Sequence, residues 1–409
     1  MRSVRISAWL ALVLYTSSAS AETALEKSVS GYAVADEAGR QALRAKIRAQ
    51  DKIAVGDVAK WTAFTQKALL ARGRHDGKEI STLHHKDYPI SYAVIGDTKG
   101  RSMSVVILLH GGGGKEVNEM AWKSTCDVAR ISKPPFDLVV VPRIWSGMEA
   151  SWGTKEGMEY LPAMLAELKR TYSIDTNRVY LWGSSMGGYG GCSFGAASAD
   201  LFAAIGTEIA ASSYGEAYRN FMNTPFAVHI GEKDTDTDRI GKARTFKANM
   251  EAMQKEHAGK YVLSWKEYPG MGHSIPPAAT AEIYGWMKPL KRDPAPKSVV
   301  WQGFKDPAQK PCENRYFWWL HTEAPTAEMR IEARIGDKNV IDIKAAGASS
   351  FTVFLNDKLV DLKKPVILRL DGREVYRGTP APSLSAIVES MAAHEDPEMV
   401  FTARIDVKK

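Results

Sequence analysis

Hydrophobic residues make up 44% and charged residues 25% of this 409-residue chain, a globular balance that excludes an intrinsically disordered protein. The formal net charge is +7, yet basic and acidic residues are interspersed and no long run of like charges occurs, so the sequence predicts no nucleic-acid partner and no membrane-surface partner. The length exceeds what one hydrophobic core usually holds, and we therefore expect two domains.

Residues 1–21 have the pattern of a secretory signal peptide. Arg2 and Arg5 form a positive region, residues 6–15 an apolar stretch, and the Ala-Ser-Ala of residues 19–21 a cleavage site of small side chains. The apolar stretch is about half of the roughly 20 residues that span a bilayer. We expect a secreted or periplasmic protein, with the alternative that this segment stays as a membrane anchor or a buried helix.

The chain has three cysteines, Cys126, Cys192 and Cys312. Export permits disulfides, but an odd count leaves at least one free thiol. Their spacing matches no metal motif, and the sequence does not assign the one pair that is possible.

Residues 22–78 are expected to form an N-terminal helical region, because apolar side chains such as Leu43, Ile47, Trp61 and Phe64 recur at helical spacing. From residue 79 the pattern changes to that of strands. The segment Ser-Val-Val-Ile-Leu-Leu of residues 104–109 is continuously apolar, which is typical of a strand buried on both faces.

Residues 79–290 are predicted to form one α/β domain with a mostly parallel, doubly wound sheet, because strands and helices alternate there. The predicted strands are 79–86, 90–95, 104–109, 138–141, 178–182, 203–209, 226–230 and 261–268, and the predicted helices are 159–172, 187–199, 242–257 and 279–287.

A charged, proline-containing linker at residues 291–298 ends this alternation. Residues 299–409 are β-rich and are expected to form a small β-sandwich-like domain. Its predicted strands are 315–322, 330–335, 340–345, 350–355, 366–370, 374–377 and 399–407, with one helix at 384–393. Carbohydrate binding, stabilisation of the interface and a lid remain open as its role. Trp318 and Trp319 are adjacent on a strand and point to opposite faces, which favours core packing over a sugar platform.

The strongest chemical signal is the G-x-S-x-G of residues 183–187, centred on Ser185. It follows a predicted strand and opens a glycine-rich helix, which is the context of a nucleophile elbow. There a serine occupies a strained turn, and small neighbours let the backbone bend. A plain Gly/Ser turn between a strand and a helix is the alternative.

A second signal is His110 followed by four glycines, directly after a buried strand. In this context the backbone N–H of Gly111 or Gly112, together with that of Met186, is expected to form an oxyanion hole. A purely structural loop is the alternative. A phosphate loop does not fit, because Lys115 is followed by Glu116 and not by Ser or Thr.

A serine nucleophile needs a base, and His273 is the downstream histidine that lies in a flexible loop after the last predicted sheet strand. Asp234 lies three residues past the glycine that ends the preceding strand and is expected to orient the imidazole. Asp236, Asp238 and Glu208 remain alternatives for this acid.

Neither a metal nor an organic cofactor is expected. The alternating aspartates of residues 234–238 suggest a calcium loop, but Arg239 and Thr245 stand where such a loop needs Gly and Glu. Trp145 and Trp152 follow another strand end and are expected to line the substrate cleft, with loop packing as the alternative.

With these residues in place, the chain resembles the α/β-hydrolase superfamily over residues 79–290. Within it, the segments RVYLWGSSMGGYGG and NTPFAVHIGEKDTDTDR look most like secreted serine carboxylesterases near the polyhydroxybutyrate depolymerase and feruloyl esterase group. Prolyl-oligopeptidase-like and dienelactone hydrolase-like groups are also similar. The appended C-terminal β domain is not part of the common core.

The resemblance implies a serine hydrolase that cleaves small-molecule or polymeric carboxylic esters through Ser185, His273 and Asp234. A prolyl-oligopeptidase-like serine peptidase would use the same residues, although the roughly 57 residues between the cleavage site and the first strand are too few for the β-propeller that such enzymes usually carry. A non-catalytic binding protein on a hydrolase scaffold is the second alternative. The sequence does not indicate the acyl group, the alcohol or the oligomeric state.

Overall fold

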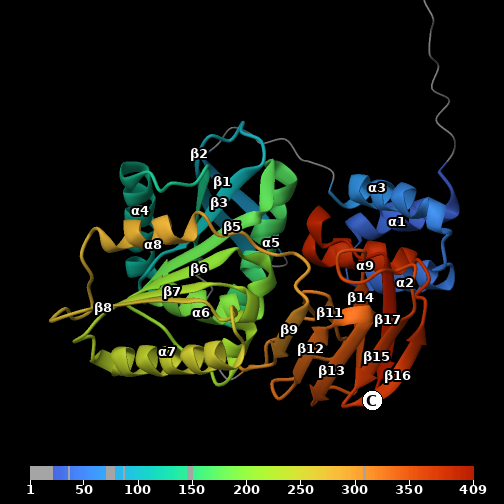
Figure 1. Ribbon diagram of the computed structural model, residues 1–409. Helices are drawn as coiled ribbons and strands as arrows, with labels where there is room; N and C mark the ends of the chain where they lie inside the picture. Colours follow the sequence, from blue (N-terminus) through green and yellow to red (C-terminus); the bar gives the residue numbers. More distant parts are fainter. Residues whose placement is uncertain (1–21, 36, 71–78, 86–87, 145–150, 307–309) are drawn as a thin grey trace, which may run out of the picture.

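The computed structural model describes residues 22–35, 37–70, 79–85, 88–144, 151–306 and 310–409. Figure 1 shows two bodies side by side, one built around a large twisted sheet and one formed by smaller sheets beneath a layer of helices. The expected signal peptide lies outside the described residues. No helix of the described part is long and apolar enough to cross a membrane.

The first body contains an eight-stranded sheet in the order β1-β2-β4-β3-β5-β6-β7-β8. β2 runs antiparallel to its neighbours β1 and β4, and the strands from β4 to β8 are parallel. The strands are β1 (Ile80–His85), β2 (Tyr88–Gly96), β3 (Met103–Leu109), β4 (Leu138–Arg143), β5 (Ile174–Ser184), β6 (Ala204–Glu208), β7 (Phe226–Gly231) and β8 (Leu263–Tyr268).

Helices cover both faces of this sheet because side chains of each strand alternate between two apolar clusters. Val106 and Leu108 of β3 pack with α4 (Lys115–Ser132) and α8 (Ala279–Met287) on one face. Val105 and Ile107 belong to the cluster on the other face, which contains α5 (Lys155–Thr171), α6 (Met186–Ala197) and α7 (Arg239–Glu256). This is the doubly wound α/β-hydrolase arrangement that the sequence predicts, with the additional helix α4.

The C-terminal part forms two sheets, β10-β11-β14-β17 and β16-β15-β13-β12-β9. Their bounds are β9 (Ser298–Gln302), β10 (Tyr316–Phe317), β11 (Leu320–His321), β12 (Arg330–Ile335), β13 (Val340–Ala346), β14 (Ser350–Leu355), β15 (Val366–Leu370), β16 (Arg373–Gly378) and β17 (Ala403–Lys408), with α9 at Leu384–His394. Buried residues alternate along β12 and β13, as expected for strands of a sandwich. The β-sandwich-like expectation is confirmed.

One predicted strand of this part is wrong in detail. Residues 315–322 form two short antiparallel strands, β10 and β11, rather than one. The chain turns back at Trp318, whose φ is +56°. Trp318 and Trp319 are 1% and 0% exposed, so both pack in the core.

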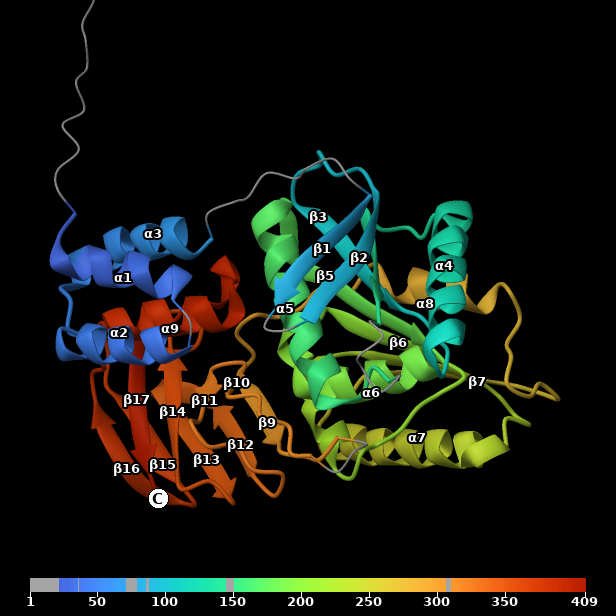
Figure 2. The same cartoon turned by 180° about the vertical axis from the view of Figure 1, so that it is seen from behind.

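The N-terminal helices pack on the C-terminal part and not on the large sheet (Figure 2). These are α1 (Ala24–Val34), α2 (Glu37–Ala49) and α3 (Val58–Leu69), which share an apolar cluster with α9. Asp51 accepts a hydrogen bond from the Ser383 hydroxyl at 2.9 Å, and Arg48 donates to Glu389 at 2.8 Å. The two ends of the chain therefore build one body together.

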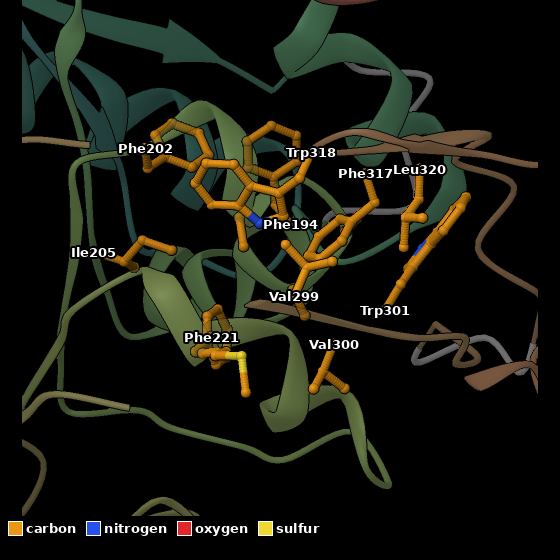
Figure 3. Close-up of a cluster of buried hydrophobic side chains, with 14 of the residues drawn as sticks. Phe194, Phe202, Ile205, Phe221, Val299, Val300, Trp301, Phe317, Trp318 and Leu320 are labelled. Carbon is orange, nitrogen blue, oxygen red and sulfur yellow. The ribbon is translucent and has the colours of Figure 1, made fainter. Parts of the chain in front are cut away.

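The two bodies share a core. Side chains of the large-sheet body (Phe194, Phe202, Ile205 and Phe221) lie beside Val299, Trp301 and Trp318 of the sandwich (Figure 3). A contact surface this apolar resembles the interior of a domain more than a mobile joint. The sandwich is therefore a fixed part of the molecule.

An ion pair without solvent access lies in the same interface. Arg292 of the linker donates to Asp396 at 2.5 Å, and both side chains are 0% exposed. Arg292 also donates to the Asp200 carbonyl at 2.8 Å and to Asn177 Oδ1 at 2.9 Å. Burial alone would raise the pKa of Asp396, but the charges of Arg292 and Lys169 hold it well below its ordinary value.

Removal of the buried cation should be strongly destabilising. Arg292→Met leaves the Asp396 carboxylate buried without its partner, and we expect the free energy of unfolding to fall by about 3–5 kcal/mol, measured by urea denaturation. Arg377→Met is the control, because Arg377 pairs with Glu374 on the surface, where the loss should stay within about 0–1 kcal/mol. Equal stability of the two variants would contradict a structural role for the Arg292–Asp396 pair.

Candidate active site

Ser185 lies in the turn between β5 and α6 and has a strained backbone, with a positive φ of +55° and ψ −117°. Its N–H donates to the Glu208 carbonyl at 2.9 Å, and its own carbonyl accepts from Tyr189 N–H at 3.1 Å, which starts the helix. A Cβ on Gly183 would lie 2.1 Å from the Gly187 carbonyl oxygen, and one on Gly187 would lie 2.0 Å from that of Leu109. Both glycines are therefore sterically required by this turn.

The structure brings Ser185, His273 and Asp234 together. Ser185 Oγ lies 2.9 Å from His273 Nε2, and His273 Nδ1 lies 2.7 Å from Asp234 Oδ2. Asp234 follows β7, whereas His273 follows β8, so two neighbouring strand ends carry the two residues. An ionised carboxylate only accepts hydrogen bonds, which assigns the proton to Nδ1 and leaves the Nε2 lone pair for the serine hydroxyl.

Asp234 has a second partner that the sequence analysis missed. Its side chain is 1% exposed, and Arg239 lies 3.3 Å from Oδ1, the oxygen that His273 does not use. Arg239 also pairs with Asp236 at 3.0 Å, whose side chain is 76% exposed. Each oxygen of the Asp234 carboxylate thus has a fixed donor, and its orientation toward His273 is determined from both sides.

The other candidates for the acid lie elsewhere. Asp236 and Asp238 precede α7 and no hydrogen bond joins either of them to His273 among the described residues. Glu208 ends β6 behind the turn of Ser185 and is 5% exposed. Its Oε1 has no hydrogen-bond partner in the described part of the chain. Burial raises the pKa of the Glu208 carboxyl to about 7.

The glycine loop after β3 passes beside the nucleophile. A Cβ on Gly111 would lie 3.5 Å from Ser185 Cβ. Gly112 and Gly113 have φ values of +133° and +158°, a conformation that favours glycine. The Gly113 N–H is already used, because it donates to Asn118 Oδ1 at 3.0 Å.

Two buried rings orient the peptide groups of this loop. Trp152 Nε1 donates to the His110 carbonyl at 2.9 Å, and His110 Nδ1 lies 2.6 Å from the Gly111 carbonyl. In a planar trans peptide the N–H points opposite to the C=O. The N–H of Gly111 therefore points away from Trp152, and that of Gly112 points away from His110. Burial lowers the pKa of His110 to about 4, so its ring is neutral at ordinary pH.

The expectation that Trp152 lines the substrate cleft is wrong. Trp152 is 0% exposed, and its ring stacks edge-on against His110 and Tyr160, with centroids 5.0 Å and 6.1 Å away. It supports the glycine loop from inside instead of contacting substrate. Trp145 lies outside the described residues. Met186 is the first residue of α6, directly after Ser185.

Cys126, Cys192 and Cys312 are all free thiols, so the one disulfide that the sequence left open does not form here. The described residues contain no group of three or more His, Cys, Asp or Glu side chains that could hold a metal ion.

No protein-family model and no curated protein matches the chain. Among solved structures, a thermostable esterase is 19% identical with a TM-score of 0.40, over 52% of this chain and 63% of that one. A ferulic acid esterase is 16% identical with a TM-score of 0.37, over 51% and 96%. The S-formylglutathione hydrolase FrmB of Staphylococcus aureus is 15% identical with a TM-score of 0.36, over 51% and 99%. This chain thus spans less than two thirds of the length of the thermostable esterase. The fold of this chain is assigned from the strand order of its own sheet.

The raised pKa of Glu208 predicts a pH-dependent stability. The ordinary value is 4.5 and the folded value about 7, so between them the folded protein keeps a proton that the unfolded chain releases, and stability falls as pH rises through this window. Glu208→Gln removes this dependence. From about pH 4 to about pH 8, wild type should lose on the order of 3 kcal/mol of unfolding free energy relative to the variant.

Urea denaturation at several pH values measures this difference. Glu251→Gln, on an exposed position of α7, is the control and should change the pH dependence very little. If the free energies of unfolding of wild type and Glu208→Gln differ by the same amount at every pH, the Glu208 carboxyl has the same pKa in the folded and the unfolded protein, which contradicts the prediction.

Proposed function

We propose that this chain is a serine hydrolase that cleaves carboxylic esters through a covalent acyl-enzyme. The observation that carries the proposal is the unbroken hydrogen-bonded path from Ser185 through His273 to Asp234, at a strained turn beside a glycine loop. A serine hydroxyl is a weak nucleophile until a positioned base accepts its proton, and this arrangement supplies that base and its orienting carboxylate.

In the first half of the reaction, Ser185 Oγ attacks the ester carbonyl while His273 Nε2 accepts its proton. The negative charge that develops on the carbonyl oxygen faces the backbone N–H groups of Met186 and of Gly111 or Gly112. Each such donor is typically worth a factor of about 10²–10³ in rate. His273 then gives the proton to the leaving alcohol, and the acyl group stays on Ser185.

In the second half, water attacks the acyl-enzyme. His273 accepts a proton from that water and returns it to Ser185 Oγ as the acid leaves. Asp234 stabilises the imidazolium in both halves without being protonated itself. The Arg239 contact at 3.3 Å holds the carboxylate oxygen of Asp234 that His273 does not use.

We also propose that the protein is exported and that cleavage after Ala21 yields a chain starting at Glu22. The support is the charge, length and small-residue pattern of residues 1–21. Expression of the full chain with N-terminal sequencing of the exported product tests this, and an uncleaved N-terminus would contradict it.

The central experiment compares wild type with Ser185→Ala on p-nitrophenyl esters of several chain lengths, acetylated and feruloylated sugars, and aminoacyl anilides. Loss of the nucleophile should lower kcat by up to about 10⁶-fold. Ester turnover that disappears in the variant supports the proposal. Turnover of anilides alone would favour a serine peptidase, and the absence of any Ser185-dependent turnover would favour a binding protein.

The assignment of the acid has its own test. Asp234→Asn keeps the shape of the side chain but no longer fixes the imidazole tautomer, and we expect kcat to fall by about 10⁴-fold. Asp236→Asn is the matched control two residues away and should retain activity within a few-fold. If the two variants lose activity equally, Asp234 is not the orienting acid.

A further inference from the structure

Helix α4 carries apolar side chains on its outer face. Among the described residues, four of the eight exposed large apolar side chains lie on this one helix, and their exposed fractions run from 46% to 82%. They are Val117, Met120, Val128 and Ile131. The opposite face of α4, which includes Trp122, packs on the large sheet. α4 lies on the outside of the large-sheet body, on the side away from the sandwich (Figures 1 and 2).

The four side chains form one continuous row, which we call the apolar stripe. An α-helix turns by about 100° per residue, which places all four within an arc of about 80°. From Val117 to Ile131 the stripe is about 21 Å long, at about 1.5 Å per residue. Single exposed apolar residues are ordinary on a protein surface, whereas an aligned set marks a contact surface.

The apolar stripe is symmetric about its centre. Val117 and Ile131 lie seven residues before and after Ser124, and Met120 and Val128 lie four residues before and after it. Ser124 is itself exposed and lies in the middle of the arc. Two identical surfaces related by a two-fold axis need this property, because residue i then contacts residue j and residue j contacts residue i.

Two α4 helices fit together when they run antiparallel and cross at Ser124. Val117 of one copy then faces Ile131 of the other, and Met120 faces Val128. Because serine is small, the helix axes can approach to the distance of about 8–10 Å that is usual for packed helices.

Charged side chains beside the stripe match in the same arrangement. Four exposed ones lie along one edge of it: Glu116, Lys123, Asp127 and Arg130. The two-fold axis places this edge of one copy against the same edge of the other, in the opposite direction. Lys123 of one copy then lies within about 3 Å, along the helix axis, of Asp127 of the other. The same holds for Glu116 and Arg130, so opposite charges meet at four places.

These charges also have partners within their own chain. Lys123 lies 3.3 Å from Glu119, and Asp127 lies 2.7 Å from Arg130. Arg130 pairs with Glu79 as well. All of these pairs lie at the surface, where ion pairs contribute little to stability and do not fix the side chains. They therefore leave the edge of the stripe able to pair with a second copy.

A lipid surface fits the stripe less well. Helices that bind anionic lipid headgroups carry an excess of Lys and Arg on their polar face. Along the edge of this stripe, two acidic residues balance two basic ones. The symmetry about Ser124 also has no use on a lipid surface.

We infer that the apolar stripe of α4 binds a second copy of this chain, in an antiparallel two-fold dimer centred on Ser124. A single helix contact is smaller than a standard interface, and interfaces of standard size have Kd values from about micromolar downward. We therefore expect a weak dimer, with a Kd on the order of 10–100 µM. Ile131 of the second copy lies beside Val117 and Asn118, the turn whose Asn118 side chain holds Gly113.

Sedimentation velocity between about 1 and about 300 µM measures this association. The mass of the wild type should rise with concentration toward that of two chains. Met120→Lys/Val128→Lys places like charges opposite each other and should stay monomeric, whereas Met120→Lys/Val128→Glu places opposite charges there and should dimerise again. Positions 120 and 128 are about 12 Å apart within one helix, so this recovery requires two copies.

A matched control changes apolar residues elsewhere. Val55→Lys/Val375→Lys alters two other exposed valines and should dimerise like the wild type. Urea denaturation of each variant checks that the fold is kept, since all the changed side chains are exposed.

Cross-linking tests the centre of the contact. Helix axes about 8–10 Å apart bring the Cα atoms of facing residues to about 3–5 Å, and a disulfide needs about 4.4–6.8 Å. Under mild oxidation, Ser124→Cys should form a covalent dimer at least about tenfold faster than Glu251→Cys, at an exposed position of α7. The wild type controls for the three native thiols.

Three results overturn the inference. The first is a wild type that stays monomeric over the whole concentration range, and the second is a dimer that Met120→Lys/Val128→Lys does not weaken. The third is Ser124→Cys cross-linking no faster than Glu251→Cys. A monomeric wild type that binds vesicles of phosphatidylcholine and phosphatidylglycerol would assign the apolar stripe to a lipid surface instead.

Discussion

The strained, positive-φ backbone of Ser185 is the constraint on which the rest of this molecule depends. A non-glycine residue in such a conformation costs on the order of 1–3 kcal/mol and persists only where its surroundings fix it. Here the carbonyl of Glu208 accepts the Ser185 N–H, and Gly183 and Gly187 allow backbone to approach where any side chain would collide. The strand β6, which provides Glu208, lies next to β5 and runs parallel to it, so both strands end at the same edge of the sheet. The same parallel order brings the ends of β7 and β8, with Asp234 and His273, to that edge.

The sandwich and the N-terminal helices extend this arrangement. Three helices at one end of the chain pack on α9 near the other end, and the resulting body shares an apolar core with the helix that follows Ser185. Phe194 of α6 lies in the same cluster as Val299 and Trp318 (Figure 3). The position of α6, and with it the turn of Ser185, thus depends on residues more than 100 positions away.

The sequence predicted those features of the fold and of the candidate site that depend on residues close together in the chain or on the order of the strands. The alternating strands, the Ser185 turn and the juxtaposition of Asp234 with His273 follow from strand periodicity, glycine spacing and the parallel order of the sheet. α4 was missed although it is as amphipathic as the predicted helix α5. The apolar residues Val117, Met120, Val128 and Ile131 on its outer face are exposed. Trp152 was assigned to the cleft because of its place after a strand end, but its hydrogen bond to His110 depends on packing that no spacing reveals. The contacts of Arg239 with Asp234 and of Asn118 with Gly113 span only five residues, and they depend on a loop conformation that spacing does not reveal. The N-terminal helices pack on α9, a distant segment whose sequence gives no sign of this contact.

The central claim is that Ser185 is an activated nucleophile, and covalent trapping tests it most directly. The purified protein is incubated with a fluorophosphonate, digested, and mapped by mass spectrometry, with a His273→Ala variant treated in parallel. The account predicts a single adduct on the peptide that contains Ser185, and slow or absent labelling in the variant because the hydroxyl no longer has a base. An unlabelled Ser185 in the wild type, or an adduct that forms equally fast without His273, would contradict the account.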